Sequence, residues 1–208
     1  MSNTDDNQGD NLKSRRSPRK IVLGISGASG VIYGQRLLDE LEKAGCELHI
    51  IITELAQQIL MDELGIMEQS ADALLGRASE RLSFHKNSDM FSPLASGSFP
   101  VDAMVVCPCS SHSVSSIAAG LADTLLLRSA YVSLKQNRSL ILVHREMPLT
   151  AIDLENMLKI TRIGGIICPA SPAFYNEPET VNNLVDTVVG RVLDLLGVDH
   201  DLPIRWSP

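Results

Sequence analysis

Short β-branched segments alternate with helical patterns along most of this chain, and this alternation limits what the chain can fold into more than any other feature. The segment from Lys20 to Ser26 reads KIVLGIS, and the helical pattern after it places Leu37, Leu38 and Leu41 on one face. A strand followed by a helix is therefore predicted, and the pattern recurs. The other predicted strands cover residues 46–53, 82–85, 101–107, 140–143 and 165–168. The other predicted helices cover residues 70–81, 151–160 and 180–197, and two more end near residue 64 and, as a long stretch, near residue 136.

A path from strand to helix to strand returns the chain in its original direction, so neighbouring strands are expected to be parallel. The predicted fold class is α/β: a doubly wound, Rossmann-like or flavodoxin-like, mainly parallel sheet with helices on both faces. Hydrophobic residues make up 44% of the chain and aromatic residues only 4%, which suits a core of Val, Ile, Leu and Ala beneath covering helices. The 208 residues suffice for one such domain, predicted over residues 20–208.

The first 19 residues differ in composition from the rest of the chain. Met1 and Leu12 are their only sizeable apolar side chains, so this segment cannot bury enough surface to offset the entropy lost on ordering it. A disordered tail is therefore predicted for residues 1–19.

Charge and cysteine content exclude several classes of partner. The formal net charge of −7 disfavours nucleic acid and an anionic membrane surface, and no apolar stretch approaches the roughly 18 residues of a membrane span. The four cysteines lack the paired spacing of a zinc site, and a chain this long with so few cysteines is not a disulfide framework. These observations predict a cytoplasmic protein with reduced thiols that binds a small molecule, and neither nucleic acid nor membrane.

Functional residues are expected in the loops that follow the strands, because ligands of doubly wound sheets bind beyond the carboxyl ends of the strands. Glycines at positions 24, 27 and 30 follow the first strand with a spacing that differs from the dinucleotide fingerprint GxGxxG, and Ser29 lies beside the next helix start. Residues 108–113 (PCSSHS) place small hydrogen-bond donors at another helix start. Each loop alone also fits a turn with a capping serine. Together, on neighbouring strands, they favour the phosphate and polyol of a mononucleotide.

Cationic side chains gather near the same strand ends. Arg128 and Lys135 are seven residues apart, which places both on one face of a continuous helix, as a solvated surface or as a contact for an anion. Arg145 and Glu146 directly follow the predicted strand that ends at Val143. Both pairs are therefore candidates for contact with a ligand at the carboxyl edge.

The last predicted helix carries one arginine in an apolar pattern. Arg191 lies seven positions after Leu184 and is expected within the apolar face, where a guanidinium needs an anion. That anion is either an internal carboxylate, Glu177 or Asp186, or the phosphate of a ligand. Tyr175, in the loop before this helix, adds a phenolic hydroxyl, so the residues alone predict a site for a phosphorylated cofactor and a second phosphate. The predicted apolar face consists of Val181, Leu184, Val185, Val188, Val192 and Leu195.

Eight segments in a fixed order carry a family resemblance. They are GISGASGVIYG, ASGSF, CPCS, LLLRSAYVSLK, LVHREMPL, DLENMLKI, CPASPAFYNEP and LVDTVVGRVLDLLGV. The chain resembles the UbiX-type flavin prenyltransferases, once described as aromatic acid decarboxylases, from about Lys20 to Trp206. The resemblance implies a metal-independent transferase that joins a dimethylallyl group from dimethylallyl phosphate to N5 and C6 of reduced FMN. It also implies a homo-oligomer, dodecameric in the family, with sites shared between subunits, and a UbiD-type decarboxylase that receives the prenylated FMN.

The resemblance further implies roles for individual residues. The residues expected to bind FMN are Gly27, Ala28, Ser29, Thr53, Ser110, Ser111, His112, Ser113, Arg128 and Arg145. The residues expected to bind the prenyl phosphate, called the prenyl-phosphate set below, are Lys135, Arg145, Glu146, Tyr175 and Arg191. The catalytic residues implied are Ser29, Glu63, Lys135, Glu146, Tyr175 and Arg191.

The residue types of the prenyl-phosphate set agree with the implied chemistry. Its three cations would stabilise the departing phosphate electrostatically without a metal, and Tyr175 would donate a hydrogen bond to that phosphate. Glu146, together with Ser29 and Glu63, would move protons, with the released phosphate as a competing base.

The sequence departs from the family pattern at a few positions. Met90, beside Phe91, takes the place of a tryptophan found in many relatives, and His112 falls at a variable position of the flavin loop. Thr53-Glu54 replaces a common Ser-Lys pair. The choice between a monophosphate and a diphosphate donor therefore stays open.

Two other functions fit a chain of this fold. FMN-dependent cysteine decarboxylases resemble it in fold and cofactor, but they carry a catalytic histidine in the first third and a PASANT-like loop where this chain has PCSSHS. A non-catalytic flavin-binding protein would need no prenyl-phosphate set, and this chain has all of that set. Both differences favour the transferase.

Overall fold

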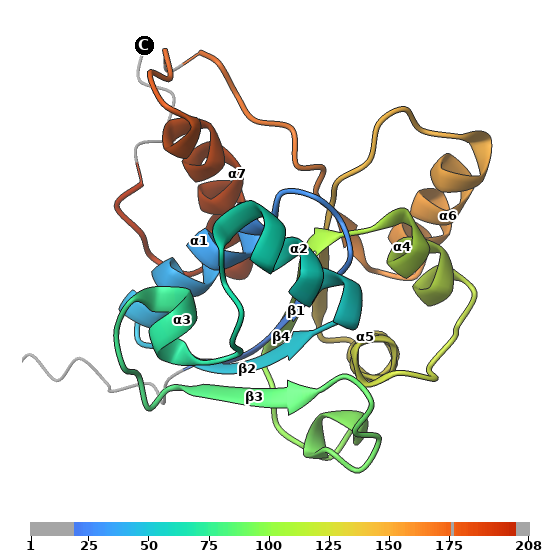
Figure 1. Ribbon diagram of the computed structural model, residues 1–208. Coiled ribbons are helices and arrows are strands. Elements are labelled where there is room, and N and C mark those ends of the chain that lie inside the picture. Colours follow the sequence, from blue (N-terminus) through green and yellow to red (C-terminus); the bar gives the residue numbers. More distant parts are fainter. Residues whose placement is uncertain (1–18, 176, 203–208) are drawn as a thin grey trace, which may run out of the picture.

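A parallel β-sheet forms the centre of the molecule (Figure 1). The structure is a computed structural model, which describes residues 19–175 and 177–202. In this part of the chain six strands lie in the order β3-β2-β1-β4-β5-β6, and every adjacent pair is parallel. The strands are β1 (Lys20–Ile25), β2 (Glu47–Ile52), β3 (Leu82–Lys86), β4 (Ala103–Cys109), β5 (Ser139–His144) and β6 (Ile166–Ile167).

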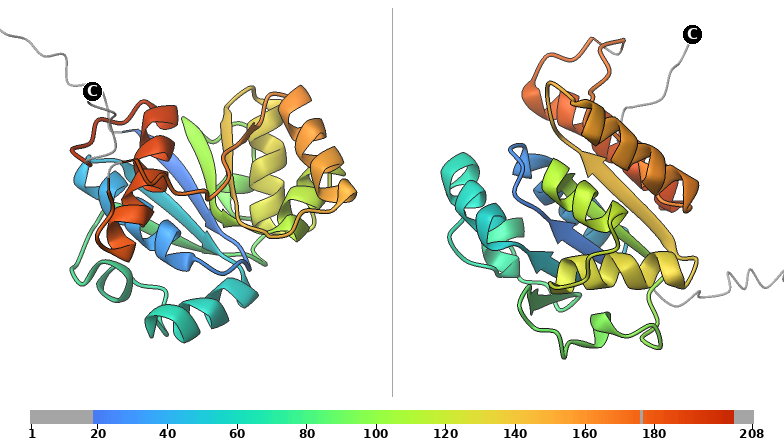
Figure 2. Two further views of the ribbon diagram at one scale, coloured as in Figure 1. Left: turned by 90° about the horizontal axis from the view of Figure 1, so that it is seen from above. Right: turned by 90° about the vertical axis from the view of Figure 1, so that its right-hand side faces the viewer.

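Helices cover both faces of the sheet (Figures 1 and 2), so the predicted doubly wound α/β fold is confirmed. The inner strands are almost entirely buried, which explains their continuous runs of Ile, Val and Leu. One face is covered by α1 (Val31–Lys43), α2 (Glu54–Leu64), α3 (Ala71–Leu75) and α7 (Val181–Leu196), and the other by α4 (Ser111–Ala118), α5 (Leu125–Lys135), α6 (Ala151–Arg162) and the short 3-10 helix η1 (Pro93–Ala95). No helix among the described residues is both long and apolar enough to cross a membrane.

Glycines make two helical regions shorter than the pattern predicts. The helix predicted over residues 70–81 ends at Leu75, because Gly76 adopts φ +67° as its C-cap. The long helix predicted to end near residue 136 is divided into α4 and α5, with Gly120 at φ +75° and the N-cap Thr124 between them. Arg128 and Lys135 still share α5, so the spacing argument for this pair holds.

Strand β4 runs two residues beyond its predicted end. It continues through Pro108 to Cys109, and its register with β5 shifts between Val106 and Cys109. Proline has no amide hydrogen for the ladder, which accounts for the irregularity at this point. The serine-rich loop therefore starts at Ser110, directly at the carboxyl edge.

Residues 1–18 and 203–208 lie outside the part of the chain that the structure describes. They include most of the predicted tail and Trp206. Arg19 is described. Its guanidinium donates hydrogen bonds to the carbonyls of Leu196 and Gly197 at the C-terminal end of α7. These contacts join the start of β1 to the end of the last helix.

Candidate functional site

The loops that follow β1 and β4 lie side by side at the carboxyl edge of the sheet. The two strands are adjacent without being consecutive, so the winding of the chain changes direction between them, and ligands of doubly wound sheets bind at such a point. Ser26, buried after β1, joins the two loops. Its hydroxyl donates to the Pro108 carbonyl at 3.1 Å and accepts the Ser110 amide at 2.9 Å. The prediction that these loops are neighbours is confirmed.

Helix α1 is capped by a carboxylate from another helix. Gly30, at φ +92°, is its N-cap, and the Ser29 side chain makes no capping bond. Glu63, near the end of α2, instead accepts the Gly30 amide at 2.9 Å and the Val31 amide at 3.1 Å. The alternative of a serine cap is therefore wrong for this loop, because the chain itself supplies the anion that the N-terminus of α1 attracts.

We expect Glu63→Ala to lower the free energy of unfolding by about 1 kcal/mol, because it removes the acceptor of two amides at a helix N-terminus. Urea denaturation measures the effect. Asp62→Ala is the matched control, since Asp62 is an exposed acidic neighbour with no hydrogen bond among the described residues. Equal stability of the two variants would show that the Glu63 cap contributes nothing.

Arg145 connects a third loop to this pair of loops. Its amide donates to the Cys109 carbonyl at 3.0 Å, and its Nε donates to the Ser29 carbonyl at 2.9 Å. The structure thus brings Ser29, Glu63 and Arg145 together. Glu146, the next residue, is exposed, and its carboxylate accepts the amide of Met147 at 3.1 Å.

The serine-rich loop forms the N-terminus of α4. Ser110 is the N-cap, and its hydroxyl accepts the Ser113 amide at 3.2 Å, so the capping alternative is confirmed for Ser110. Thr53 caps α2 in the same way. The amides of Ser111 and His112, at the first two positions of α4, have no partner among the described residues. Such amides can bind an anionic ligand.

Three of the predicted phosphate-binding cations have no carboxylate partner. Within residues 19–175 and 177–202, neither Arg128, Lys135 nor Arg145 forms an ion pair. Arg128 donates from Nε to the Ala95 carbonyl at 3.2 Å. Arg36, by contrast, contacts three carboxylates at 2.7 to 3.2 Å. The three cations without an ion pair are therefore available to an anionic ligand.

Arg191 lies outside the buried face of α7, so the prediction that it sits within the apolar face is wrong. Its side chain is 64% exposed, and its ion pair is a long one of 3.7 Å with Asp194. Asp186, predicted as an internal partner, instead pairs with Arg36 at 2.7 Å. Leu184 is half-buried, so the seven-residue spacing places Arg191 at the edge of the apolar stripe. The buried residues are Val185, Val188, Val189, Val192, Leu193 and Leu196.

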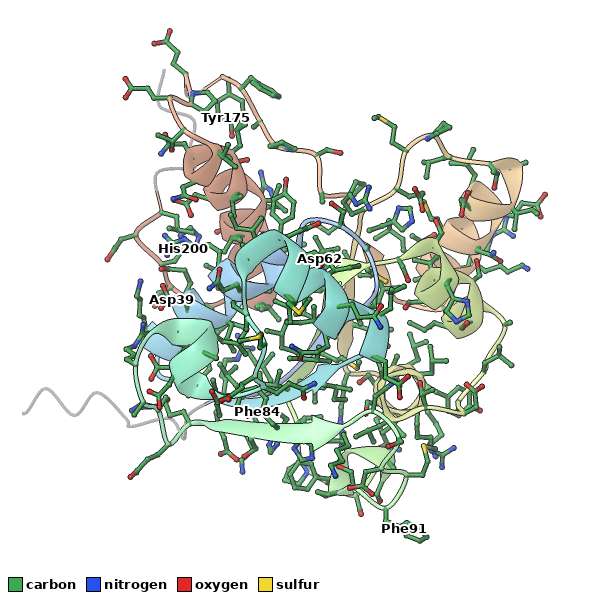
Figure 3. The ribbon with its side chains drawn as sticks, viewed as in Figure 1. Asp39, Asp62, Phe84, Phe91, Tyr175 and His200 are labelled. Carbon is green, nitrogen blue, oxygen red and sulfur yellow. The ribbon has the colours of Figure 1, made fainter. Side chains whose placement is uncertain are left out.

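The prenyl-phosphate set is divided between the two sides of the molecule. Helix α5, which carries Lys135, packs on one face of the sheet, and α7, which carries Arg191, packs on the other. Tyr175 is half-exposed on the long connection to α7 and lies beyond the N-terminal end of that helix, far from α5 (Figure 3). One copy of the chain therefore keeps Lys135 apart from Tyr175 and Arg191.

Sequence reasoning missed two buried polar residues beside the serine-rich loop. His144 ends β5, with Nε2 3.0 Å from the Ser111 hydroxyl, and burial lowers its pKa. Asp153 forms a capping box with Thr150 at the start of α6. Hydrogen bonds from the Thr150 hydroxyl at 2.6 Å and the Thr150 amide at 2.8 Å lower the pKa of Asp153 to about 2. Sequence position could have identified both residues. His144 directly precedes Arg145, and Asp153 follows a threonine by three residues, the spacing of a capping box.

Comparison with known families and sequences gives one consistent result. The family model described as Flavoprotein matches residues 10–193. A protein of Methanocaldococcus jannaschii named flavin prenyltransferase UbiX is 46% identical over 188 residues, which cover 90% of this chain and 98% of the relative. The flavin prenyltransferase UbiX of Pseudomonas aeruginosa is 42% identical over 198 residues, covering 91% of this chain and 95% of the relative.

Solved structures agree with these relatives. The crystal structure of AnUbiX (PadA1) in complex with FMN and dimethylallyl pyrophosphate matches with a TM-score of 0.86 and 38% identity, covering 92% of this chain and 99% of that one. A dodecameric FMN-dependent UbiX-like decarboxylase from Escherichia coli O157:H7 matches with a TM-score of 0.83 and 41% identity, covering 91% and 100%. The cysteine decarboxylase TvaF shares only the fold, with a TM-score of 0.58, 16% identity, and coverage of 84% of this chain and 98% of that one.

Proposed function

The chain belongs to the UbiX-type flavin prenyltransferases, and we propose that it joins a dimethylallyl group from dimethylallyl phosphate to N5 and C6 of reduced FMN, without a metal. The product would be prenylated FMN, and its proposed recipient is a UbiD-type decarboxylase. The proposed location is the cytoplasm, where the four free, buried cysteines would stay reduced.

The observation that carries this proposal is a set of anion-binding groups without partners. They lie at the switch point, the place between β1 and β4 where the winding of the chain changes direction. The amides of Ser111 and His112 suit a phosphate, and the Arg145 guanidinium beside them has no carboxylate partner among the described residues. These groups fit FMN, whose phosphate is anionic and whose polyol accepts and donates hydrogen bonds. The proposed FMN residues are Gly27, Ala28, Ser29, Thr53, Ser110, Ser111, His112, Ser113, Arg128 and Arg145.

The cations of the prenyl-phosphate set are proposed to drive departure of the phosphate. Reduced FMN, when bound, supplies the nucleophilic N5 and C6 and a π surface. Lys135, Arg145 and Arg191 would hold the donor phosphate and stabilise the charge that grows on it as its bond to carbon breaks. Tyr175 would donate a hydrogen bond to the same phosphate.

Carboxylates near the switch point are proposed to move protons. Glu146 is exposed beside Arg145, where it would accept a proton as the new bonds form. Arg145 donates to the Ser29 carbonyl and Glu63 accepts the amide of the next residue, Gly30, so Ser29 and Glu63 would assist from the same loops.

We propose that the active unit is a homo-oligomer, dodecameric as in the E. coli relative, with each site built from more than one copy. The separation of Lys135 from Tyr175 in one copy supports this proposal. Helix α6 also exposes three large apolar side chains, Ile152, Leu154 and Leu158. An exposed apolar group of this kind is typical of a surface covered by another copy.

The test mixes the purified protein anaerobically with reduced FMN and dimethylallyl phosphate, and then measures the mass of the flavin. The expected result is a gain of one prenyl unit. A parallel reaction with the diphosphate compares the two donors, and addition of an FMN-free UbiD-type decarboxylase tests the recipient. Unmodified flavin from protein that binds FMN would contradict the transferase proposal.

A further inference from the structure

Two histidines and a serine form a hydrogen-bonded chain at the connection between β3 and β4. His49 Nδ1 in β2 lies 3.1 Å from His85 Nε2 in β3, and His85 Nδ1 lies 3.0 Å from the hydroxyl of Ser92. His49 is 5% exposed and Ser92 is 4% exposed. We call these three residues the histidine chain. They come from two neighbouring strands and from the N-cap of η1, so the histidine chain ties η1 to the β3 edge of the sheet.

The direction of the hydrogen bonds in the histidine chain follows from its surroundings. Burial lowers the pKa of both rings, so both are neutral at pH 7. His49 Nε2 lies 3.6 Å from a carboxylate oxygen of Glu47, which pairs with Lys20 at 3.0 Å. The ring nitrogen that faces the carboxylate carries the hydrogen, so His49 Nδ1 is an acceptor. The hydrogen between the rings therefore belongs to His85 Nε2, and His85 Nδ1 accepts the hydroxyl hydrogen of Ser92.

The same serine fixes η1, and η1 in turn holds Arg128. The Ser92 hydroxyl accepts the Leu94 amide at 3.4 Å as the N-cap of η1. At the other end of η1, the Ala95 carbonyl accepts a hydrogen bond from Arg128 Nε at 3.2 Å. The Leu94 carbonyl accepts the Ser129 hydroxyl at 3.4 Å, which adds a second bond between η1 and α5. A continuous path of hydrogen bonds and one short helix therefore runs from β2 to the guanidinium of Arg128.

The Ala95 carbonyl is the only hydrogen-bond partner of the Arg128 side chain among the described residues. A single bond from Nε leaves the two terminal nitrogens of the guanidinium for an anion and restricts where they point. We infer that the members of the histidine chain are positioning residues: through η1 they hold the Arg128 guanidinium in place to bind FMN. This inference rests on the proposed FMN site, to which Arg128 belongs.

The first measurement needs no ligand. NMR of the full-length protein follows the exchange of the Arg128 Nε hydrogen with water, which the bond to the Ala95 carbonyl slows. We expect His85→Phe and Ser92→Ala each to speed this exchange about fivefold, the size of one lost hydrogen bond. Ser98→Ala is the matched control, because it removes an exposed hydroxyl that makes a 2.9 Å hydrogen bond in the same connection but outside the histidine chain. It should leave the exchange unchanged.

The second measurement is the dissociation constant of FMN, by calorimetry. We expect His85→Phe to raise it about fivefold and Ser98→Ala to leave it unchanged. Arg128→Met removes the guanidinium itself and should raise the dissociation constant at least as much. The double variant of His85→Phe and Arg128→Met should lose no more affinity than Arg128→Met alone, because His85 acts through Arg128. A role of His85 in general stability would instead add its own loss in the double variant.

Several results would overturn the inference. Unchanged exchange or unchanged FMN affinity in His85→Phe, or additive losses in the double variant, would each do so. ¹⁵N NMR of the wild-type protein should show the hydrogen of both rings on Nε2, and a hydrogen on Nδ1 of either ring would refute the histidine chain. Wild-type protein that binds no FMN would refute the proposed site, while the exchange measurement would still decide whether the histidine chain positions Arg128. If His85→Phe fails to fold, Ser92→Ala replaces it in both measurements.

Discussion

Arg191→Leu should abolish prenyl transfer while the protein keeps its fold and its affinity for FMN. The side chain is 64% exposed and makes one long ion pair, so its removal leaves no buried group without a partner. Loss of one charge that stabilises the departing phosphate should lower kcat by at least about a hundredfold. The fold and the chemistry are therefore expected to respond very differently to one substitution.

The position of Arg191 supports this expectation. Burial raises the pKa of the Cys168 thiol, and the charge of Arg191 opposes that effect. Arg191 therefore lies near Cys168, the residue that follows β6. A guanidinium with only one long ion pair would be available to the proposed donor phosphate.

The matched control is Arg81→Leu, which removes another exposed arginine at the amino end of β3, the opposite edge of the sheet. It should leave kcat, melting temperature and FMN affinity unchanged. Mass measurement of the flavin gives the rate, and calorimetry gives the affinity. A parallel loss of melting temperature and FMN affinity in Arg191→Leu would assign Arg191 a structural role instead.

Local patterns in the sequence predict the sheet and its loops well, for a physical reason. Strands buried on both faces need continuous β-branched residues, so segments such as residues 20–26 and 46–53 stand out without any knowledge of their neighbours. The ends of helices are predicted less accurately where a glycine interrupts an otherwise helical pattern. Gly76 and Gly120 have positive φ angles, and glycines in this conformation commonly end a helix, as they do here.

Contacts between distant segments explain what the sequence did not predict in the site. Glu63 caps α1 from a different helix, and no local spacing indicates that partner. Arg191 and Leu184 share one stripe of α7, but which stripe is buried depends on where α1 packs against it. His144 meets Ser111 only because the end of β5 lies beside the start of α4.

Mixed oligomers of two inactive variants should recover activity if each site is built from more than one copy. Lys135 is exposed at the end of α5, so Lys135→Met should leave the fold intact and, like Arg191→Leu, remove a charge from the donor phosphate. Each variant alone then lacks one cation in every site. A site that takes Lys135 from one copy and Arg191 from another would be complete whenever both donors carry the intact residue.

Random assembly of equal amounts of the two variants makes about a quarter of such shared sites complete, so activity should return to about a quarter of the wild-type value. Co-expression with two different affinity tags, followed by purification through both, isolates the mixed oligomers. If Lys135 and Arg191 instead served the same site from the same copy, no site in any mixture would be complete, because every copy lacks one of the two residues. Mixed oligomers without activity would therefore contradict the shared site. Recovered activity would explain why one copy carries Lys135 and Arg191 on opposite faces of its sheet.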